Sequence, residues 1–134
     1  MRAFAILVLL LAVPILAEEA GSQSVGPTAP VVDHAVICTG VVNRAPVGAG
    51  EAFDAAVGAL WCFTRISGVE GESTITHTWY MGEHKVHEQP LAVRGPSWRT
   101  WSMKSIPPDW KGPWHVDIVV ADGTVVTTVA FTVQ

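Results

Sequence analysis

Histidine is the side chain with the widest chemical range in this chain of 134 residues, because it serves both as a general base and as a metal ligand. The five histidines are His34, His77, His84, His87 and His115. A nucleophile needs such a base within hydrogen-bond reach, but none of the five lies in a recognisable catalytic motif. The histidines by themselves therefore assign no catalytic residue.

The other candidates for chemistry fail on their surroundings. Ser102 follows Trp101 without the flanking glycines of a nucleophile elbow, and no pair of carboxylates has a spacing typical of glycosidases. His84 and His87 are three residues apart, so on a strand they point to opposite faces and cannot share a metal ion. A solvated hairpin tip is the expected structure of His84–Glu88. The sequence predicts a non-enzymatic protein with no catalytic residues, no cofactor and no metal site.

The two cysteines, Cys38 and Cys62, lie in strand-like segments of a chain that we expect to be exported, where oxidation is the default. A disulfide between them is the favoured interpretation, and it would stabilise the fold by roughly 3–4 kcal/mol in the chain-entropy model. Two buried thiols are the alternative that the sequence leaves open. The chain has neither a Cys-x-x-Cys motif nor a zinc-ligand pair.

Aromatic residues are the most distinctive feature, since the chain holds six tryptophans. Aromatic side chains that point outward beside an arginine are suited to stack against a sugar or a partner protein. Trp101 with Arg99 is the leading candidate for such a ligand-binding surface, and Tyr80 and Trp110 are weaker candidates. The alternative is structural: tryptophans of a small β domain often fill the core, and Arg99 across Trp101 would then be only a cation–π pair.

Strands must position these side chains, because short runs rich in Val, Ile, Thr and aromatic residues, bounded by Gly, Pro and Asp, fill the chain from residue 31 onward. The expected strands are Val31–Val41, Ala52–Ala55, Ala59–Ile66, Thr74–Met81, Lys85–Val93, Trp98–Lys104, Trp114–Ala121 and Thr124–Val133. Asp122-Gly123 predicts a tight hairpin, and Gly82-Glu83 a looser one. The fold class is all-β: a single antiparallel β-sandwich of seven or eight short strands, immunoglobulin-like in architecture, over residues 31–134. In a true immunoglobulin domain the tryptophan lies well between the two cysteines, whereas here Trp61 directly precedes Cys62.

Alternation along each strand assigns the buried faces. Trp79 and Trp114 point inward as structural residues, and His77 is carried inward with Trp79. Trp98 and Trp101 are three positions apart, so an unbulged strand sends them to opposite faces, and one indole is in the core while the other is not. With Gly82-Glu83 at the hairpin tip, His77 stands opposite Glu88. We therefore expect a structural histidine–carboxylate pair.

A set of motifs between residues 76 and 123 resembles a known family. The motifs are Thr76-His77-Thr78-Trp79-Tyr80, Gly95-Pro96-Ser97-Trp98-Arg99-Thr100-Trp101-Ser102 with Lys104, and Gly112-Pro113-Trp114 running into Asp122-Gly123. Together they resemble the uncharacterised bacterial family DUF2914, over nearly all of Val31–Val133. The resemblance implies no activity. Relatives often carry an aliphatic residue at the position of Thr100, which implies that Trp98 and Thr100 face inward and that Arg99 and Trp101 face outward. The cysteines are not part of the family pattern.

The amino-terminal segment predicts export. Arg2 precedes an apolar run from Ala3 to Ala17 that is shorter than the roughly 20 residues of a membrane-spanning helix, so residues 1–17 read as a signal peptide cleaved after Ala17. An uncleaved amino-terminal anchor is the alternative. Residues 18–30 are poor in bulky apolar groups and predict a flexible linker. The expected location is the periplasm or the extracellular space, with no stable membrane span after cleavage.

Charge narrows the range of partners. Without Arg2, 12 acidic residues stand against 7 basic ones, so the mature protein is mildly acidic and nucleic acid is excluded as a partner. A glycan or an envelope protein is the expected partner. The sequence thus predicts a binding or accessory module, with protein–protein interaction through an exposed sheet edge, or a purely structural role in the envelope, as alternatives. A hydrolase is the least favoured.

Overall fold

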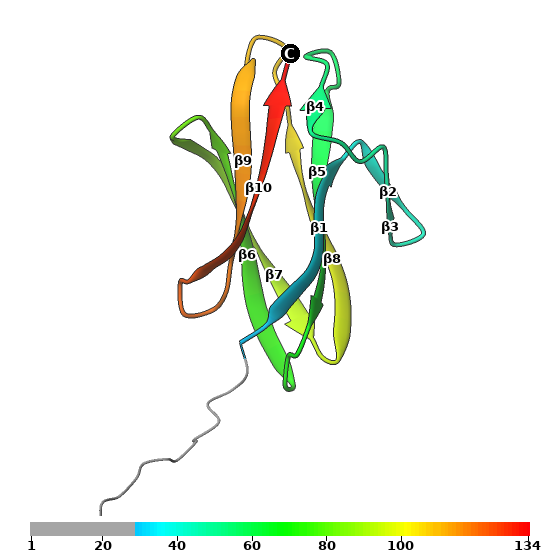
Figure 1. Cartoon of the computed structure of the whole chain (residues 1–134), viewed down its shortest axis with the longest axis vertical. Helices are drawn as coiled ribbons and strands as arrows, with labels where there is room; N and C mark the ends of the chain where they lie inside the picture. Colours follow the sequence, from blue (N-terminus) through cyan, green and yellow to red (C-terminus); the bar gives the residue numbers. More distant parts are fainter. Residues whose placement is uncertain (1–28) are drawn as a thin grey trace, which may run out of the picture.

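Ten strands and no helix make up residues 29–134, the part of the chain that this computed structural model describes (Figure 1). In chain order the strands are β1 (Val31–Cys38), β2 (Gly40–Val42), β3 (Ala45–Val47), β4 (Ala52–Phe53), β5 (Ala59–Ser67), β6 (Glu72–Met81), β7 (His84–Arg94), β8 (Ser97–Ser105), β9 (Gly112–Val119) and β10 (Val125–Val133). The all-β fold class is confirmed. The expected signal peptide (1–17) lies outside the described residues, as does all of the expected linker except Ala29 and Pro30. No helix of the described range is long and apolar enough to cross a membrane.

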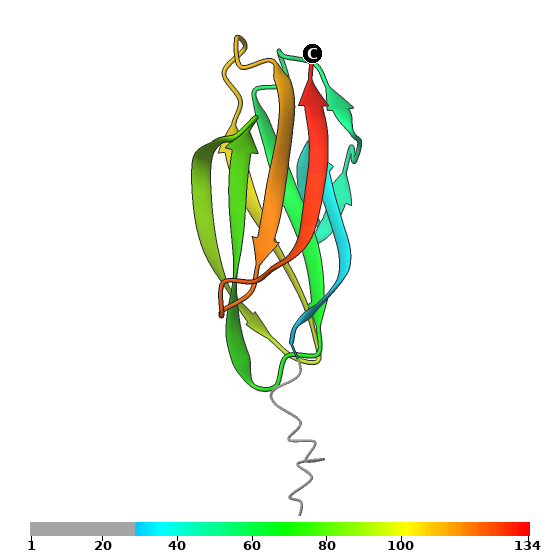
Figure 2. The ribbon, with the colours of Figure 1, turned by 60° about the vertical axis from the view of Figure 1, so that its left-hand side comes forward.

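The strands form three sheets. A five-stranded sheet has the order β4-β10-β9-β6-β7, a three-stranded sheet has the order β1-β5-β8, and β2 and β3 form a separate hairpin. In Figure 1, β9 and β10 lie on one side of the molecule, β1, β5 and β8 on the other, and the β2–β3 hairpin projects beyond the three-stranded sheet. Figure 2 shows the five-stranded sheet more nearly face-on. Neighbouring strands are antiparallel except β4 and β10, which run parallel, so the expectation of a wholly antiparallel fold is wrong at that edge.

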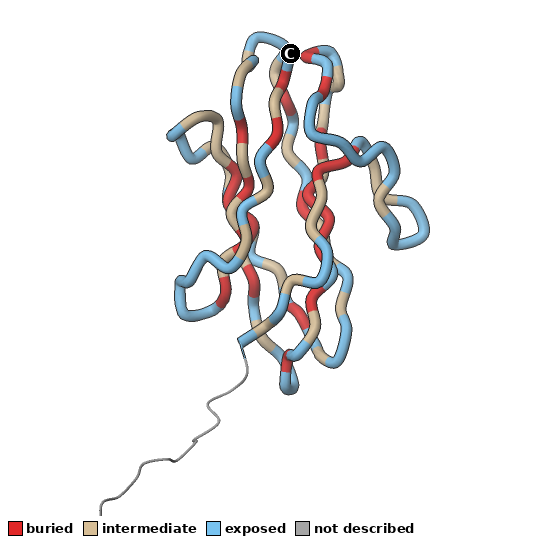
Figure 3. The backbone as a smooth tube through the Cα atoms, viewed as in Figure 1, coloured by how far each residue is buried: buried red, intermediate tan, exposed pale blue. Residues whose placement is uncertain are grey.

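The core lies between the two larger sheets, because each sheet turns its apolar residues toward the other. Leu60, Cys62 and Ile66 of β5 are fully buried, as are Val116 and Ile118 of β9. These residues alternate with more exposed ones, as the period of a strand requires. Figure 3 shows that buried residues follow the strands, whereas the turns are mostly exposed.

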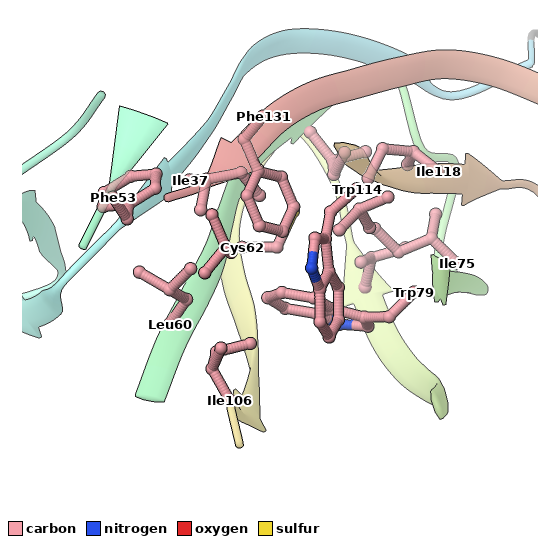
Figure 4. Close-up of a cluster of buried hydrophobic side chains, with 14 of the residues drawn as sticks. Ile37, Phe53, Leu60, Cys62, Ile75, Trp79, Ile106, Trp114, Ile118 and Phe131 are labelled. Carbon is pink, nitrogen blue, oxygen red and sulfur yellow. The ribbon is translucent and has the colours of Figure 1, made fainter. Parts of the chain in front are cut away.

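Three large aromatic side chains occupy the middle of this core (Figure 4). The Phe131 ring stacks on Trp114 at 5.8 Å between centroids and meets Trp79 edge-on at 6.1 Å. Trp79 is fully buried, and Trp114 is 2% exposed. Both indoles therefore have the inward position that alternation predicted.

The strand count differs from the expected seven or eight because the first segment is divided. We expected one strand over Val31–Val41, but β1 ends at Cys38 and the chain turns back through the β2–β3 hairpin. Asn43 and Arg44 form its tip with φ angles of 51° and 60°, the left-handed conformation that two-residue hairpin turns require. The turn was missed because it lacks the glycine that usually marks such a tip. By contrast, the hairpin at Asp122-Gly123 is confirmed, and Gly123 N donates to Val120 O at 2.9 Å.

Candidate functional site

His77 does not pair with Glu88, so this prediction is wrong. Met81 pairs with His84 as expected, but β7 has one extra residue at Val86, and beyond this bulge the register moves by one position. His77 therefore stands opposite Gln89. Glu88 forms instead an exposed ion pair with Lys85, at 2.9 Å.

The ring of His77 reaches across the core to the three-stranded sheet. Its Nδ1 lies 2.7 Å from Ser102 Oγ of β8, and its Nε2 lies 3.2 Å from Thr64 Oγ1 of β5. The Thr64 hydroxyl donates to Thr100 O at 2.9 Å, and Trp79 Nε1 donates to Ser102 Oγ at 3.0 Å. The two sheets are thus joined through their polar side chains as well as through apolar contacts.

Only one arrangement of protons satisfies this chain of hydrogen bonds. The single hydroxyl hydrogen of Thr64 goes to a carbonyl, so His77 Nε2 must carry a hydrogen and donate to Thr64. Nδ1 of the neutral ring is then an acceptor and receives the hydroxyl hydrogen of Ser102, whose oxygen accepts from Trp79. Burial lowers the pKa of His77 to about 4, because a charged ring would lose its hydration. A second proton on the ring would also leave the Ser102 hydroxyl without an acceptor.

The pair of Ser102 and His77 has the contact of a nucleophile and its base but not the access. His77 is 0% exposed and Ser102 is 4% exposed, so neither has an open side on which a substrate could lie. What the arrangement does is fix the position of one sheet on the other. Sequence reasoning missed this contact. Ser102 is four residues after Trp98 and therefore on the same inward face, so alternation could have identified it as a buried polar residue.

The expected disulfide is also absent: Cys38 and Cys62 are free, buried thiols. Cys38 is the register partner of Trp61, and Cys62 is the partner of Ile37. Residues opposite one another share a face and successive residues alternate, so the two sulfurs leave the β1/β5 pair on opposite faces. Burial raises the pKa of both thiols.

The outer face of the three-stranded sheet carries the leading ligand-binding candidates. In the β5/β8 pair, Arg99 stands opposite Arg65, and Trp101 stands opposite Phe63. Trp98 belongs to the other face, opposite a fully buried residue of β5, and packs against the core. The structure thus places Trp98 inward and Trp101 outward.

Two rows of side chains cross this outer face from β1 to β8. One row is His34, Arg65 and Arg99, and the other is Val36, Phe63 and Trp101. We refer to these six residues together with Arg44 as the outer patch. Phe63 is only 3% exposed, because the His34 ring meets it edge-on at 6.0 Å and the Trp101 indole lies nearly parallel to it at 6.2 Å. Trp101 itself is half-buried, so its indole is held in place while part of it stays accessible.

The tip of the β2–β3 hairpin completes the outer patch. Arg99 Nη1 donates to Arg44 O at 3.1 Å, which holds the hairpin tip against β8. Arg44, Arg99 and Trp101 line an open hollow of about 420 Å³, together with Leu91 and Ala92 of β7. The hollow gives a ligand room beside the indole.

The two weaker candidates lie elsewhere. Tyr80 points outward from the five-stranded sheet and stacks on His115 at 4.6 Å. Trp110 packs against Trp114 at 6.1 Å, and Lys104 Nζ lies 5.4 Å from the centre of its ring. Of the four candidates, only Arg99 and Trp101 are therefore brought together.

Comparison with known proteins finds one family. Residues 72–133 match the model of a family described as a protein of unknown function, DUF2914. The match confirms the predicted resemblance, and we refer to residues 72–133 as the DUF2914 segment. All the motifs that carried the resemblance lie within it, but it is shorter than the expected Val31–Val133. No curated protein matches the chain.

Most of the outer patch lies before the DUF2914 segment. Arg99 and Trp101 are inside it, whereas Phe63, Arg65 and Arg44 precede residue 72. Sequence reasoning missed these three residues. Alternation along Ala59–Ile66 could have predicted that Phe63 and Arg65 point outward. Only the register of β5 on β8, however, shows that they lie beside Trp101 and Arg99. Within residues 29–134, no group of three or more His, Cys, Asp or Glu side chains is placed so that it could hold a metal ion.

Proposed function

We propose that this protein is an exported, non-enzymatic binding or accessory module of immunoglobulin-like β-sandwich architecture, and that its outer patch binds a glycan. The observation that supports the proposal is the half-buried Trp101, stacked on Phe63 and adjoining an open hollow with Arg99. A sugar ring stacks on an indole through its apolar face, and an indole already held by a neighbour loses little freedom on binding. Arginine beside it supplies hydrogen bonds to hydroxyl groups.

A protein partner that adds a strand to a sheet edge is the second candidate. β7 is an edge strand of 11 residues and offers such a template. However, Pro90 within it lacks an N–H group, and the bulge at Val86 interrupts its regular pairing. Both features are typical of edges that resist strand addition, so the glycan proposal has the stronger support.

Export is proposed from residues 1–17 alone. Cleavage after Ala17 predicts a mature protein that begins at Glu18. Amino-terminal sequencing of the protein recovered from the envelope or medium of the producing cells measures this directly. A protein that retains Met1 contradicts the proposed cleavage and supports the anchor.

Binding is tested with the purified protein and a set of peptidoglycan fragments and neutral and acidic oligosaccharides, by calorimetry. Trp101→Ala is expected to abolish binding to the glycan that the native protein binds, with only about 1 kcal/mol lost in stability, because the indole is on the outer face. Tyr80→Ala is the matched control, since it removes an outward aromatic from the other sheet. Binding that survives Trp101→Ala and is lost in Tyr80→Ala contradicts the proposed site. A stoichiometric protein partner in place of any glycan contradicts the proposed ligand.

A further inference from the structure

We infer that the glycan bound by the outer patch is anionic, and that its carboxylate or phosphate groups are held by Arg65, Arg99 and Arg44. This inference rests on the proposed glycan-binding function and adds the chemical class of the ligand. Its basis is a concentration of arginines that the fold itself does not neutralise.

The three arginines come from three different parts of the chain, and Arg65 and Arg44 each lie next to Arg99. Arg65 of β5 and Arg99 of β8 are direct register partners on the outer face. Arg44 reaches the same place from the hairpin tip, where its carbonyl oxygen accepts a hydrogen bond from Arg99 at 3.1 Å. Arg44 and Arg99 both line the open hollow beside Trp101.

None of these arginines has a carboxylate partner among residues 29–134. The ion pairs within residues 29–134 are Lys85–Glu88, Arg94–Glu72 and His115–Asp117. Like charges directly opposite each other on a sheet are unfavourable, so the Arg65–Arg99 pair opposes the stability of the β5/β8 pairing. The chain as a whole has a formal net charge of −4, so the patch has the opposite sign to the rest of the molecule. A bound anion would remove the repulsion that the fold leaves in place.

The geometry suits an acidic sugar better than a free anion. The row with Arg65 and Arg99 runs directly beside the row with Phe63 and Trp101, two residues further along each strand, or about 7 Å away. A sugar stacked on Trp101 therefore brings its substituents next to guanidinium groups. Arginine binds carboxylate and phosphate groups through two parallel hydrogen bonds, which neutral hydroxyl groups cannot match in strength.

The test compares one polymer with and without acidic groups. Binding of the full chain to carboxymethyl-dextran and to unmodified dextran of the same length is measured by calorimetry at two salt concentrations. We expect binding to carboxymethyl-dextran at least tenfold tighter than to dextran, and weakened by salt. Arg65→Gln and Arg99→Gln are each expected to weaken it about tenfold. Arg94→Gln is the matched control, because Arg94 is exposed and already paired with Glu72.

Each remaining outcome has a defined meaning. Equal binding to both polymers that is lost in Trp101→Ala but kept in the arginine variants overturns the anionic ligand and keeps the glycan site. Binding to carboxymethyl-dextran that is lost in the arginine variants but kept in Trp101→Ala upholds an anionic ligand and overturns stacking on Trp101. Binding to neither polymer overturns the anionic ligand, whereas the glycan site itself is decided by the peptidoglycan fragments and oligosaccharides described above. Arg99→Lys keeps the charge but removes the two parallel guanidinium donors, and its thermal melt shows whether the variant is folded. Competition by glucuronate or by glucose 6-phosphate shows whether the bound group is a carboxylate or a phosphate.

Discussion

Acidification from pH 7 to pH 4 should destabilise this protein through His77. Burial lowers the pKa of the folded protein's His77 to about 4 from the usual 6.5, because the ring is enclosed between the sheets. Between these two values the unfolded chain binds a proton that the folded protein does not. The contribution of His77 to the free energy of unfolding is therefore greatest above about pH 6.5 and falls as the pH drops toward 4. Below about pH 4 this contribution no longer changes.

The size of the effect follows from the difference between the two pKa values. From 6.5 to about 4, at about 1.36 kcal/mol for each pH unit, His77 contributes about 3 kcal/mol at neutral pH. Domains of this size are typically stable by only about 5–15 kcal/mol, so the loss is a large share. With a slope of about 1–3 kcal/mol per molar urea, the urea midpoint should fall by about 1–3 M from this residue.

The assay is urea unfolding of the native protein and of His77→Gln at several values between pH 7.5 and pH 3.5. Every other titrating group is common to both proteins, so the difference between their free energies of unfolding isolates His77. That difference should shrink by about 3 kcal/mol as the pH falls. A difference that stays constant with pH, or a ring that titrates near 6.5 by NMR in the folded protein, refutes the buried neutral ring.

Three further predictions concern the core and the turns. Ser102→Ala should lower the free energy of unfolding by about 2–5 kcal/mol in urea melts, because it leaves two buried groups without partners; a loss below about 1 kcal/mol contradicts the hydrogen-bond chain. Cys38 and Cys62 should resist alkylation in the folded protein and both react after unfolding without reductant, by mass spectrometry; two unmodified residues there reveal a disulfide. Gly95→Ala should destabilise by about 1–3 kcal/mol, because its Cβ would collide with a backbone carbonyl, whereas Gly40→Ala, which meets open space, should cost less than about 1 kcal/mol in the same thermal melts.

Local patterns were enough to predict most of the fold. Alternation placed Trp79 and Trp114 inward, and the glycine turn at Asp122-Gly123 located the last hairpin. These features depend on residues that are neighbours in the sequence, so the sequence displays them directly. The Asn43-Arg44 turn was missed for the same reason, since its conformation has no glycine to mark it.

Long-range relations were beyond the sequence. A single bulge at Val86 moved the partner of His77 from Glu88 to Gln89, and alternation cannot reveal where a strand holds an extra residue. The register of β1 on β5, which separates the sulfurs of Cys38 and Cys62, is likewise set by the whole sheet. The outer patch depends on such a register as well. For this reason only Arg99 and Trp101 of the candidate site were predicted, and its other two arginines were not.

The pairing of β8 has a consequence for how the protein can be divided. The DUF2914 segment begins at residue 72 and contains β6 to β10, but β8 takes its backbone partners from β5, which precedes the segment. A fragment of residues 72–133 would leave β8 as an isolated strand, with His77 Nε2 deprived of its Thr64 acceptor. The family match is therefore not an autonomous folding unit. Fragments for expression should begin near residue 29, and any other protein that carries this segment must supply from elsewhere a strand that pairs with β8 as β5 does here.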